Sequence, residues 1–167
     1  MTRRFPATTA RAVAEKLVSE LRGATERIEI AGSLRRNRPF VHDIDVVAYP
    51  AAGGTEIDVL LRGLVERGSL TPVRDGGKIK NFIATKTGIP IDIYFAGLDT
   101  FYTLLLIRTG SKNHNIKLAM RAKDLGLKLR ASGDGIEQAD GTRISVQCEE
   151  DVFRILGLPY LPPEGRE

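Results

Sequence analysis

Three aspartates lie in segments with strand-like alternation, and their spacing suits the binding of divalent cations. Asp43 and Asp45 are two residues apart, so on a strand both carboxylates face the same way, and Asp92 alternates with apolar neighbours in a second such segment. Carboxylates on one sheet face repel each other, so a cation is their natural partner, and oxygen ligands suit Mg²⁺ or Mn²⁺. Two such ions, roughly 3.5–4 Å apart, can assist a phosphoryl transfer. Taken alone, the Asp-x-Asp pair is also typical of two surface acids at a strand end.

A Gly-Ser turn about ten residues before these acids adds a pattern that binds phosphate. Gly32 and Ser33 follow a strand-like segment, and Arg35 and Arg36 come soon after. Glycine lets the backbone approach an anion, a serine hydroxyl can donate to it, and the guanidinium forks fit phosphate oxygens. The order strand, Gly-Ser, Arg-Arg, Asp-x-Asp predicts a triphosphate held beside a two-metal site.

Composition narrows the class of protein. A chain of 167 residues fits one domain or two small subdomains, and 42% hydrophobic residues predict a folded, soluble protein. The single cysteine, Cys148, excludes an internal disulfide and a cysteine-rich metal cluster. The sequence has no apolar run long enough to span a membrane, and its start lacks the pattern of a signal peptide. We therefore expect an intracellular protein, cytoplasmic if prokaryotic, that is a monomer and does not contact membranes.

The net charge of +4 hides two basic zones. Nine basic residues and four acids precede Pro39, and residues 107–130 hold seven basic residues and a single acid. The segment between these zones is slightly acidic and contains the three aspartates. This distribution suits a protein that holds polyphosphate or nucleic acid over a metal site, although ordinary solvated helix faces are an equally good interpretation of charge alone.

The elements that must position these residues change character at Gly97. Helical spacing predicts helices over 10–21, 55–64, 98–107, 111–125 and 149–156, with a short helical turn over 34–36. Alternation predicts strands over 27–31, 42–49, 70–74, 78–86 and 89–95, and short strands near Lys128 and Ile144. The sequence therefore predicts an α+β protein with a mixed sheet-and-helix half over 1–97 and a mainly helical half over 98–167.

Several segments of the chain resemble the family X DNA polymerases of the beta and lambda type. They are Arg4-Phe5-Pro6, Ala31-Gly32-Ser33-Leu34-Arg35-Arg36, His42-Asp43-Ile44-Asp45-Val46, Ile91-Asp92-Ile93, Arg108-Thr109-Gly110-Ser111 with Asn115, and the tail from Glu150 to Tyr160. The tail is the most specific, because many nucleotidyltransferases share the Gly-Ser and Asp-x-Asp motifs. The resemblance implies a nucleotidyltransferase palm, with a mixed β-sheet and helices on one face, over 1–97. It implies a small C-terminal nucleotide- and DNA-binding subdomain over 98–167.

The resemblance also implies a role for each matching residue. Asp43, Asp45 and Asp92 would be the catalytic metal ligands for two ions per active site, Mg²⁺ or Mn²⁺. The residues that would bind the nucleotide are Gly32, Ser33 and Arg36 at the β- and γ-phosphates, Arg4 as a weaker candidate there, Gly110 at the sugar and Asn115 at the base. From the second basic zone, the candidate DNA contacts are Arg108, Lys112, Lys117 and Arg121.

We therefore expect a DNA-directed DNA polymerase that adds a dNTP to a primer 3′-hydroxyl on primer–template or gapped DNA, in repair or end joining. No lyase domain fits before Arg4, so we expect no deoxyribose-phosphate lyase activity. Ile107-Arg108 replaces the family's Tyr-Phe pair, and Ala119 stands where polymerase beta-like enzymes have a template-contacting arginine. These departures leave open a template-independent transferase that acts on single-stranded DNA or RNA ends. The second alternative is an inactive module that binds DNA or a partner.

Overall fold

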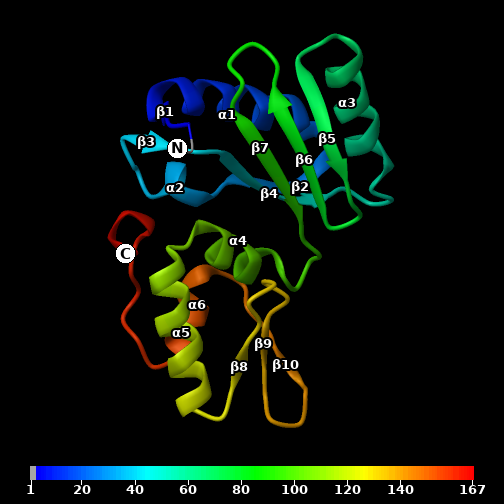
Figure 1. Cartoon of the computed structure of the whole chain (residues 1–167). Coiled ribbons are helices and arrows are strands. Elements are labelled where there is room, and N and C mark those ends of the chain that lie inside the picture. The colour runs from blue at the N-terminus through cyan, green and yellow to red at the C-terminus, as the bar shows by residue number, and fades with distance from the viewer. Residues whose placement is uncertain (1–2) are drawn as a thin grey trace.

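The structure of the protein, a computed structural model, describes residues 3–167 (Figure 1). The first part of the chain forms β1 (Phe5–Pro6), α1 (Ala7–Leu21), η1 (Arg22–Ala24), β2 (Thr25–Ile30), α2 (Gly32–Arg35), β3 (Phe40–Val41), β4 (Ile44–Pro50), α3 (Thr55–Glu66), β5 (Leu70–Asp75), β6 (Ile79–Ala84) and β7 (Pro90–Phe95). The second part forms α4 (Phe101–Thr109), α5 (Lys112–Asp124), β8 (Lys128–Leu129), β9 (Ile136–Glu137), β10 (Arg143–Ile144), α6 (Glu149–Ile155) and η2 (Pro163–Gly165). None of the helices in 3–167 is both long and apolar enough to cross a membrane.

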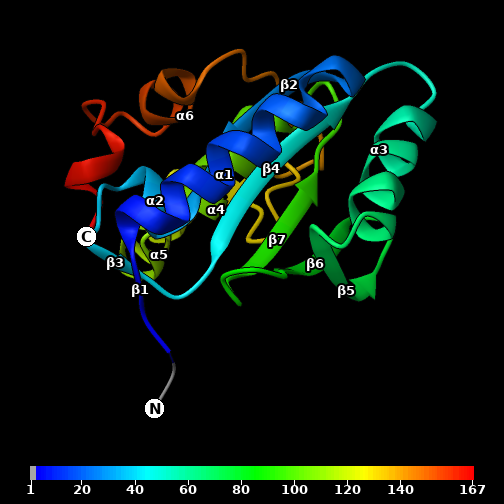
Figure 2. The ribbon, with the colours of Figure 1, turned by 90° about the horizontal axis from the view of Figure 1, so that it is seen from above.

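A five-stranded mixed sheet organises the first part, in the order β2-β4-β7-β6-β5. Strands β4 and β7 are parallel, whereas the other neighbours are antiparallel. The alternation of β4 places Ile44, Val46 and Ala48 in the core beneath α1 and α3, and Val47 in a separate cluster with α4. Figure 2 shows α1 and α3 on the same side of the sheet, with α4 beneath it. The α+β class and the mixed sheet predicted from the sequence are confirmed.

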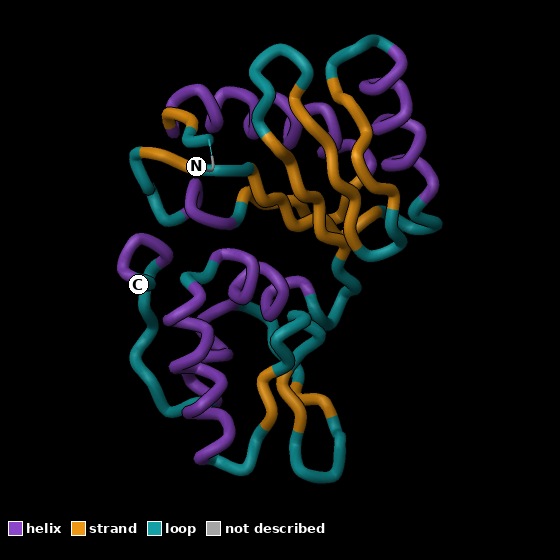
Figure 3. Tube along the Cα trace, in the orientation of Figure 1, coloured by secondary structure: helices purple, strands orange, loops and turns teal. Residues whose placement is uncertain are grey.

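The second part packs three helices against a small three-stranded sheet, β10-β9-β8 (Figure 3). Its core gathers apolar side chains of α4, α5, α6 and the short strands. A third cluster joins the two parts, because Phe101, Leu104 and Leu105 of α4 pack against Ala31 and Val47 beside the sheet. Helix α4 is therefore shared between the two cores, and its end is held close to the edge of the sheet that carries the acids.

Several boundaries differ from the predicted ones by a few residues. The strand expected from His42 begins at Ile44, so Asp43 lies in the preceding loop. The helix expected from Leu98 begins at Phe101, because the Thr100 hydroxyl accepts a hydrogen bond from the Gly97 amide at 3.0 Å and forms a turn there. Ser111 caps α5 by accepting a hydrogen bond from the His114 amide. The two-residue strands β3 and β9 were too short to be predicted from the alternation.

Candidate active site

A cleft of about 610 Å³ lies between the acid-bearing edge of the sheet and the turn that joins α4 to α5. Nine of the predicted site residues line it: Gly32, Ser33, Arg36, Asp43, Asp45, Arg108, Gly110, Lys112 and Asn115. Asp92, Arg4, Lys117 and Arg121 are outside this lining. The structure therefore brings together the Gly-Ser turn, two of the acids and the α4–α5 turn, although they are far apart in the sequence.

The Gly-Ser turn lies directly against Asp45. The Ala31 amide donates to the Asp45 carbonyl oxygen at 2.8 Å, which ties the start of α2 to β4. Gly32 has a φ of +63°, and a Cβ atom there would lie 2.0 Å from Asp45 Oδ2. Any side chain would therefore be strained by the backbone and would overlap the carboxylate. Only glycine lets the turn approach the acid this closely.

Arg36 connects the Gly-Ser turn to the opposite wall of the cleft. Its guanidinium donates to the carbonyl oxygen of Thr109. Gly110 follows with a φ of +71°, and a Cβ atom there would lie 3.1 Å from Arg36 Nη1. The glycine thus makes room for the guanidinium, so the residues expected at the phosphates and at the sugar are neighbours in space.

The acids on the sheet are electrostatically coupled. Asp45 lies opposite Asp92 in the parallel register of β4 and β7. Burial, followed by the charges of Asp43 and Asp92, raises the pKa of Asp45 to about 7. Burial and the charge of Asp92 also raise the pKa of Asp43. No salt bridge within 3–167 neutralises any of the three. Oxygen donors that crowd each other in this way fit a hard divalent cation.

The three acids do not, however, converge on one point. Asp92 accepts a hydrogen bond from Asn81 Nδ2 at 2.6 Å, and the Tyr94 hydroxyl lies 3.4 Å from its other oxygen. In the part of the chain that the structure describes, no three His, Cys, Asp or Glu side chains are grouped so that they could hold a metal ion. In this structure Asp92 is paired with Asn81 and Tyr94, and the assignment of the three aspartates as metal ligands stays a prediction.

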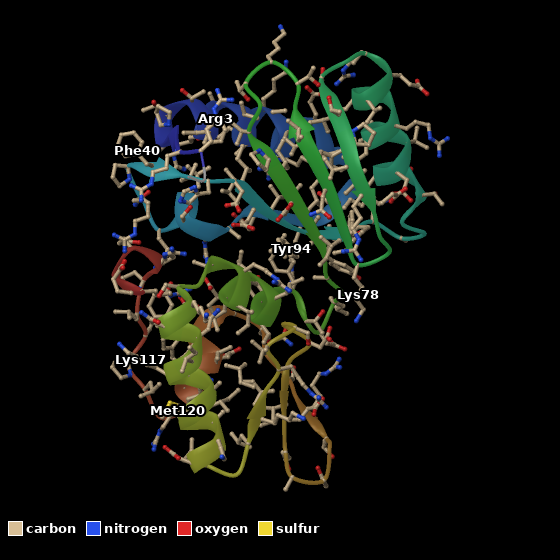
Figure 4. All side chains as sticks on the ribbon, in the orientation of Figure 1. Arg3, Phe40, Lys78, Tyr94, Lys117 and Met120 are labelled. Carbon is tan, nitrogen blue, oxygen red and sulfur yellow. The ribbon has the colours of Figure 1, made fainter. Side chains whose placement is uncertain are left out.

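The basic residues of the second zone have different surroundings: some line the cleft, one contacts the rest of the protein and one is exposed. Arg108 reaches toward the sheet and stacks on Tyr94, with 4.2 Å between its Cζ atom and the ring centroid. Figure 4 shows Tyr94 between the sheet and α4, and Lys117 on α5, where it is exposed. Arg121 Nε donates to the Leu156 carbonyl oxygen at 2.9 Å, so this side chain is engaged at the end of α6. Arg4, on the other part of the chain, is exposed.

Asn115 is held in the wall of the cleft. Its Nδ2 atom donates to the Ile107 carbonyl oxygen at 2.8 Å. Its Oδ1 atom is buried and has no hydrogen-bond partner among residues 3–167. A buried acceptor that stays unpaired is costly, so Asn115 gains from a rearrangement that gives its Oδ1 atom a partner.

A buried ionic cluster behind the cleft was missed by the sequence reasoning, which treated Arg35 as a phosphate donor. Arg35 donates to both carboxylate oxygens of Glu149, at 2.9 and 2.6 Å, and to the Thr109 hydroxyl at 2.9 Å. Arg166, which is fully buried, donates to the same carboxylate at 2.8 Å. Partners more than a hundred residues apart leave no local signal in a sequence. Tyr94 was missed too, because it looks like an ordinary strand residue.

Comparisons with known proteins support the family that the motifs indicate. Residues 104–167 match the family described as DNA polymerase beta thumb. The DNA polymerase/3′-5′ exonuclease PolX of Bacillus subtilis (strain 168) is 31% identical over 172 residues, covering 98% of this chain and 29% of that protein. DNA polymerase lambda of Rattus norvegicus is 26% identical over 159 residues, covering 81% of this chain and 28% of that protein. The chain thus spans less than a third of the curated relatives it matches.

The fold also matches solved structures. The crystal structure of Leishmania infantum polymerase beta in a ternary P/T complex superposes with a TM-score of 0.84, at 21% identity, and covers 99% of this chain and 77% of that one. The ternary gap complex of the same protein gives the same TM-score at 20% identity. These matches span both parts of the molecule, the sheet as well as the helices after it.

Proposed function

Because the chain belongs to the family X DNA polymerases, we propose that it carries their nucleotidyl-transfer centre and adds a dNTP to a primer 3′-hydroxyl in short gaps. The observation that carries the proposal is the cleft. It joins a phosphate-binding turn at Ser33 and Arg36, the acids Asp43 and Asp45, and a glycine turn at Gly110. This arrangement suits a triphosphate laid across the acids, with its sugar against the α4–α5 turn.

Asp43, Asp45 and Asp92 would hold two Mg²⁺ or Mn²⁺ ions. When bound, such ions stabilise the negative charge that develops on the attacking and leaving oxygens of a phosphoryl transfer. The raised pKa of Asp45 supports this assignment, since a carboxylate that its neighbours destabilise gains most from a cation. Asp92 would keep its hydrogen bond from Asn81, since that bond uses Oδ1 and leaves further lone pairs of the carboxylate for a cation.

The remaining cleft residues orient the nucleotide. Ser33 and Arg36 would bind the β- and γ-phosphates, since a hydroxyl donor and a guanidinium fork fit phosphate oxygens. Arg36 already contacts Thr109, so phosphate binding would also draw the α4–α5 turn against the sheet. Gly110, which lines the cleft, would lie against the sugar, and Asn115 would meet the base once its buried acceptor is uncovered.

DNA would be held largely through its phosphates. Lys112 lies in the cleft wall and Lys117 projects from α5. Contacts of this kind release counterions, so binding should weaken steeply as salt is added.

Template-independent transfer to single-stranded DNA or RNA ends is the second candidate function. Ala119 and Ile116 line the cleft on the α5 side, and neither side chain offers a hydrogen-bond donor to a template base. A cleft wall that offers template bases few hydrogen-bond donors supports nucleotide transfer without a template.

Primer extension separates the two candidates. We expect incorporation of dNTP on a one-nucleotide gap, and little on a blunt end or a single strand, with dNTP preferred to rNTP. Asp43→Asn should abolish incorporation, whereas Asp99→Asn, which alters an exposed acid away from the cleft, should not change it. Equal extension of the single strand favours the second candidate. Full activity of the Asp43 variant rejects the assigned centre.

A further inference from the structure

Arg108 is an unusual cation for a DNA-binding surface, because it is partly buried and rests on a residue of the acid-bearing strands. It belongs to the last turn of α4 and lines the cleft. Its guanidinium stacks on the Tyr94 ring at 4.2 Å. Its Nε atom is buried and has no hydrogen-bond partner within 3–167. The Nε donor of Arg108 therefore makes no hydrogen bond that would hold the guanidinium in the cleft wall.

The support comes from Tyr94 and the acids behind it. The Tyr94 hydroxyl donates to Asp92 Oδ2 at 3.4 Å, and Asp92 lies opposite Asp45 in the register of β4 and β7, so the ring that carries Arg108 lies beside both carboxylates. Burial and the neighbouring acids raise the pKa of Asp45, whereas the Tyr94 hydroxyl and the charge of Arg108 lower it. Arg108 therefore stabilises the ionised carboxylates from the α4 side.

Arg36, the other arginine in the cleft, is less free to do so. It donates to the Thr109 carbonyl oxygen and is packed against Gly110. Arg36 also has a buried, unpaired Nε and also interacts with the charge of Asp45. Arg108 differs in that its guanidinium rests on the Tyr94 ring rather than on a backbone carbonyl, and its charge acts on Asp45 from there.

We propose that Arg108 is a positioning residue that, through Tyr94, holds Asp45 and Asp92 in the absence of metal and competes with divalent cations for these carboxylates. The inference rests on the proposed function, since it assumes that the acids bind metal. It assigns Arg108 to the metal centre, where the sequence indicated a DNA contact. In this chain the cation that balances the acids comes from α4 of the second part, so metal binding and the position of α4 are linked.

The test is Mn²⁺ binding to the protein without nucleotide or DNA, measured by calorimetry or by electron paramagnetic resonance. Arg108→Met removes a charge that opposes the ion, so we expect about tenfold tighter binding. Arg108→Lys keeps the charge and should stay close to the wild type. The matched control is Arg27→Met, because Arg27 also stacks on an aromatic ring, that of Tyr102 at 5.1 Å, but is not part of the cleft.

The outcomes distinguish an Arg108 that competes with the metal from an Arg108 with a purely structural role. A merely structural Arg108 would lower the melting temperature of the methionine variant and leave Mn²⁺ binding unchanged or weaker, which would overturn the proposal. If that variant does not fold, Arg108→Gln, which keeps a polar group for the cleft, carries the same expectation. Asp45→Asn is measured alongside. If it binds Mn²⁺ like the wild type, the metal centre of the proposed function fails. If it loses Mn²⁺ and the Arg108 variant gains nothing, only this inference fails.

Discussion

Asp45 and Glu149 are both shielded from solvent, yet the neighbouring charges are mainly negative at Asp45 and positive at Glu149. Burial acts to raise the pKa of Glu149, but the hydrogen bonds and charges of Arg35 and Arg166 hold it below its usual value. Burial and two further acids raise the pKa of Asp45 to about 7. Glu149 is therefore stable as an anion within the folded protein, whereas Asp45 is not.

The difference shows which of the buried carboxylates can still bind a cation. The oxygens of Glu149 are occupied by two arginines, so the cluster can only link α2, α6 and the C-terminal segment. The acids of the sheet form no salt bridge among residues 3–167, and the charge of Arg108 offsets their repulsion only in part, so they remain available to a cation. Both environments meet at α2, because Gly32 at its start touches Asp45 and Arg35 at its end binds Glu149. One four-residue helix thus connects the candidate catalytic edge with the structural cluster.

The largest effect should come from Asp45→Asn. We expect nucleotide incorporation on gapped DNA to fall about a thousandfold, because a metal ligand is lost. The free energy of unfolding should stay equal or rise by ~1 kcal/mol, since a buried carboxylate that repels its neighbours is neutralised. Primer extension and denaturant unfolding measure the two quantities. An inactive variant that is also strongly destabilised would remove the contrast with Glu149.

Glu149→Gln should mainly lower the free energy of unfolding, in contrast to Asp45→Asn. It leaves Arg35 and the fully buried Arg166 without an anion, and breaking such a pair costs about 3 kcal/mol of unfolding free energy. The matched control is Glu150→Gln, one residue on and exposed, which should change stability by less than about 0.5 kcal/mol. Denaturant unfolding of both variants gives the comparison. Equal stability of the two would mean that the cluster contributes little.

The sequence predicted the elements around Asp45 better than those around Glu149. Alternation in 42–49 and 89–95 and the break at Gly32 are local signals, and the elements they predict are present within a few residues. Asp45 and Asp92 are opposite each other because β4 and β7 pair in parallel, which the sequence does not state. The turning of Asp92 toward Asn81 depends on the neighbouring strand β6, and no spacing within one segment encodes it.

The ionic cluster was beyond prediction for the same physical reason. Arg35 resembles a phosphate donor because it follows the Gly-Ser turn, and only the packing of α2 against α6 brings it to Glu149. Arg166 lies near the end of the chain, where a charged residue usually suggests solvent, yet it is fully buried. Contacts made across the whole chain decide which of two adjacent arginines, Arg35 or Arg36, faces the cleft.

A smaller effect should come from Gly32→Ala, which tests how closely α2 and Asp45 are packed. The φ of +63° and the overlap with Asp45 should together cost about 2 kcal/mol of unfolding free energy. Gly54→Ala is the control, because Gly54 has the same φ but nothing within 4 Å, so it should cost only about 1 kcal/mol. In an Asp45→Ala background the extra cost at Gly32 should shrink. An unchanged difference there would place the strain elsewhere.

The pH dependence of stability should separate the two carboxylates by sign. With the metal removed by a chelator, the folded protein keeps a proton on Asp45 up to about pH 7, whereas the unfolded chain releases it near its ordinary value of 3.8. The contribution of Asp45 to stability should therefore fall as the pH rises through this window, by about 1 kcal/mol per pH unit, and level off above it. Glu149, whose folded pKa is lowered, stabilises fully above its ordinary value of 4.5 and loses this contribution as the pH falls through the folded pKa. His114 acts in the opposite direction below its ordinary value of 6.5, because burial lowers its folded pKa to about 4. The Asp45 contribution is therefore the difference between two proteins: urea unfolding from about pH 5 to pH 8 should show stability falling more steeply with pH, or rising less, in the wild type and in Glu149→Gln than in Asp45→Asn. Equal slopes in the wild type and in Asp45→Asn would mean that another group carries the proton.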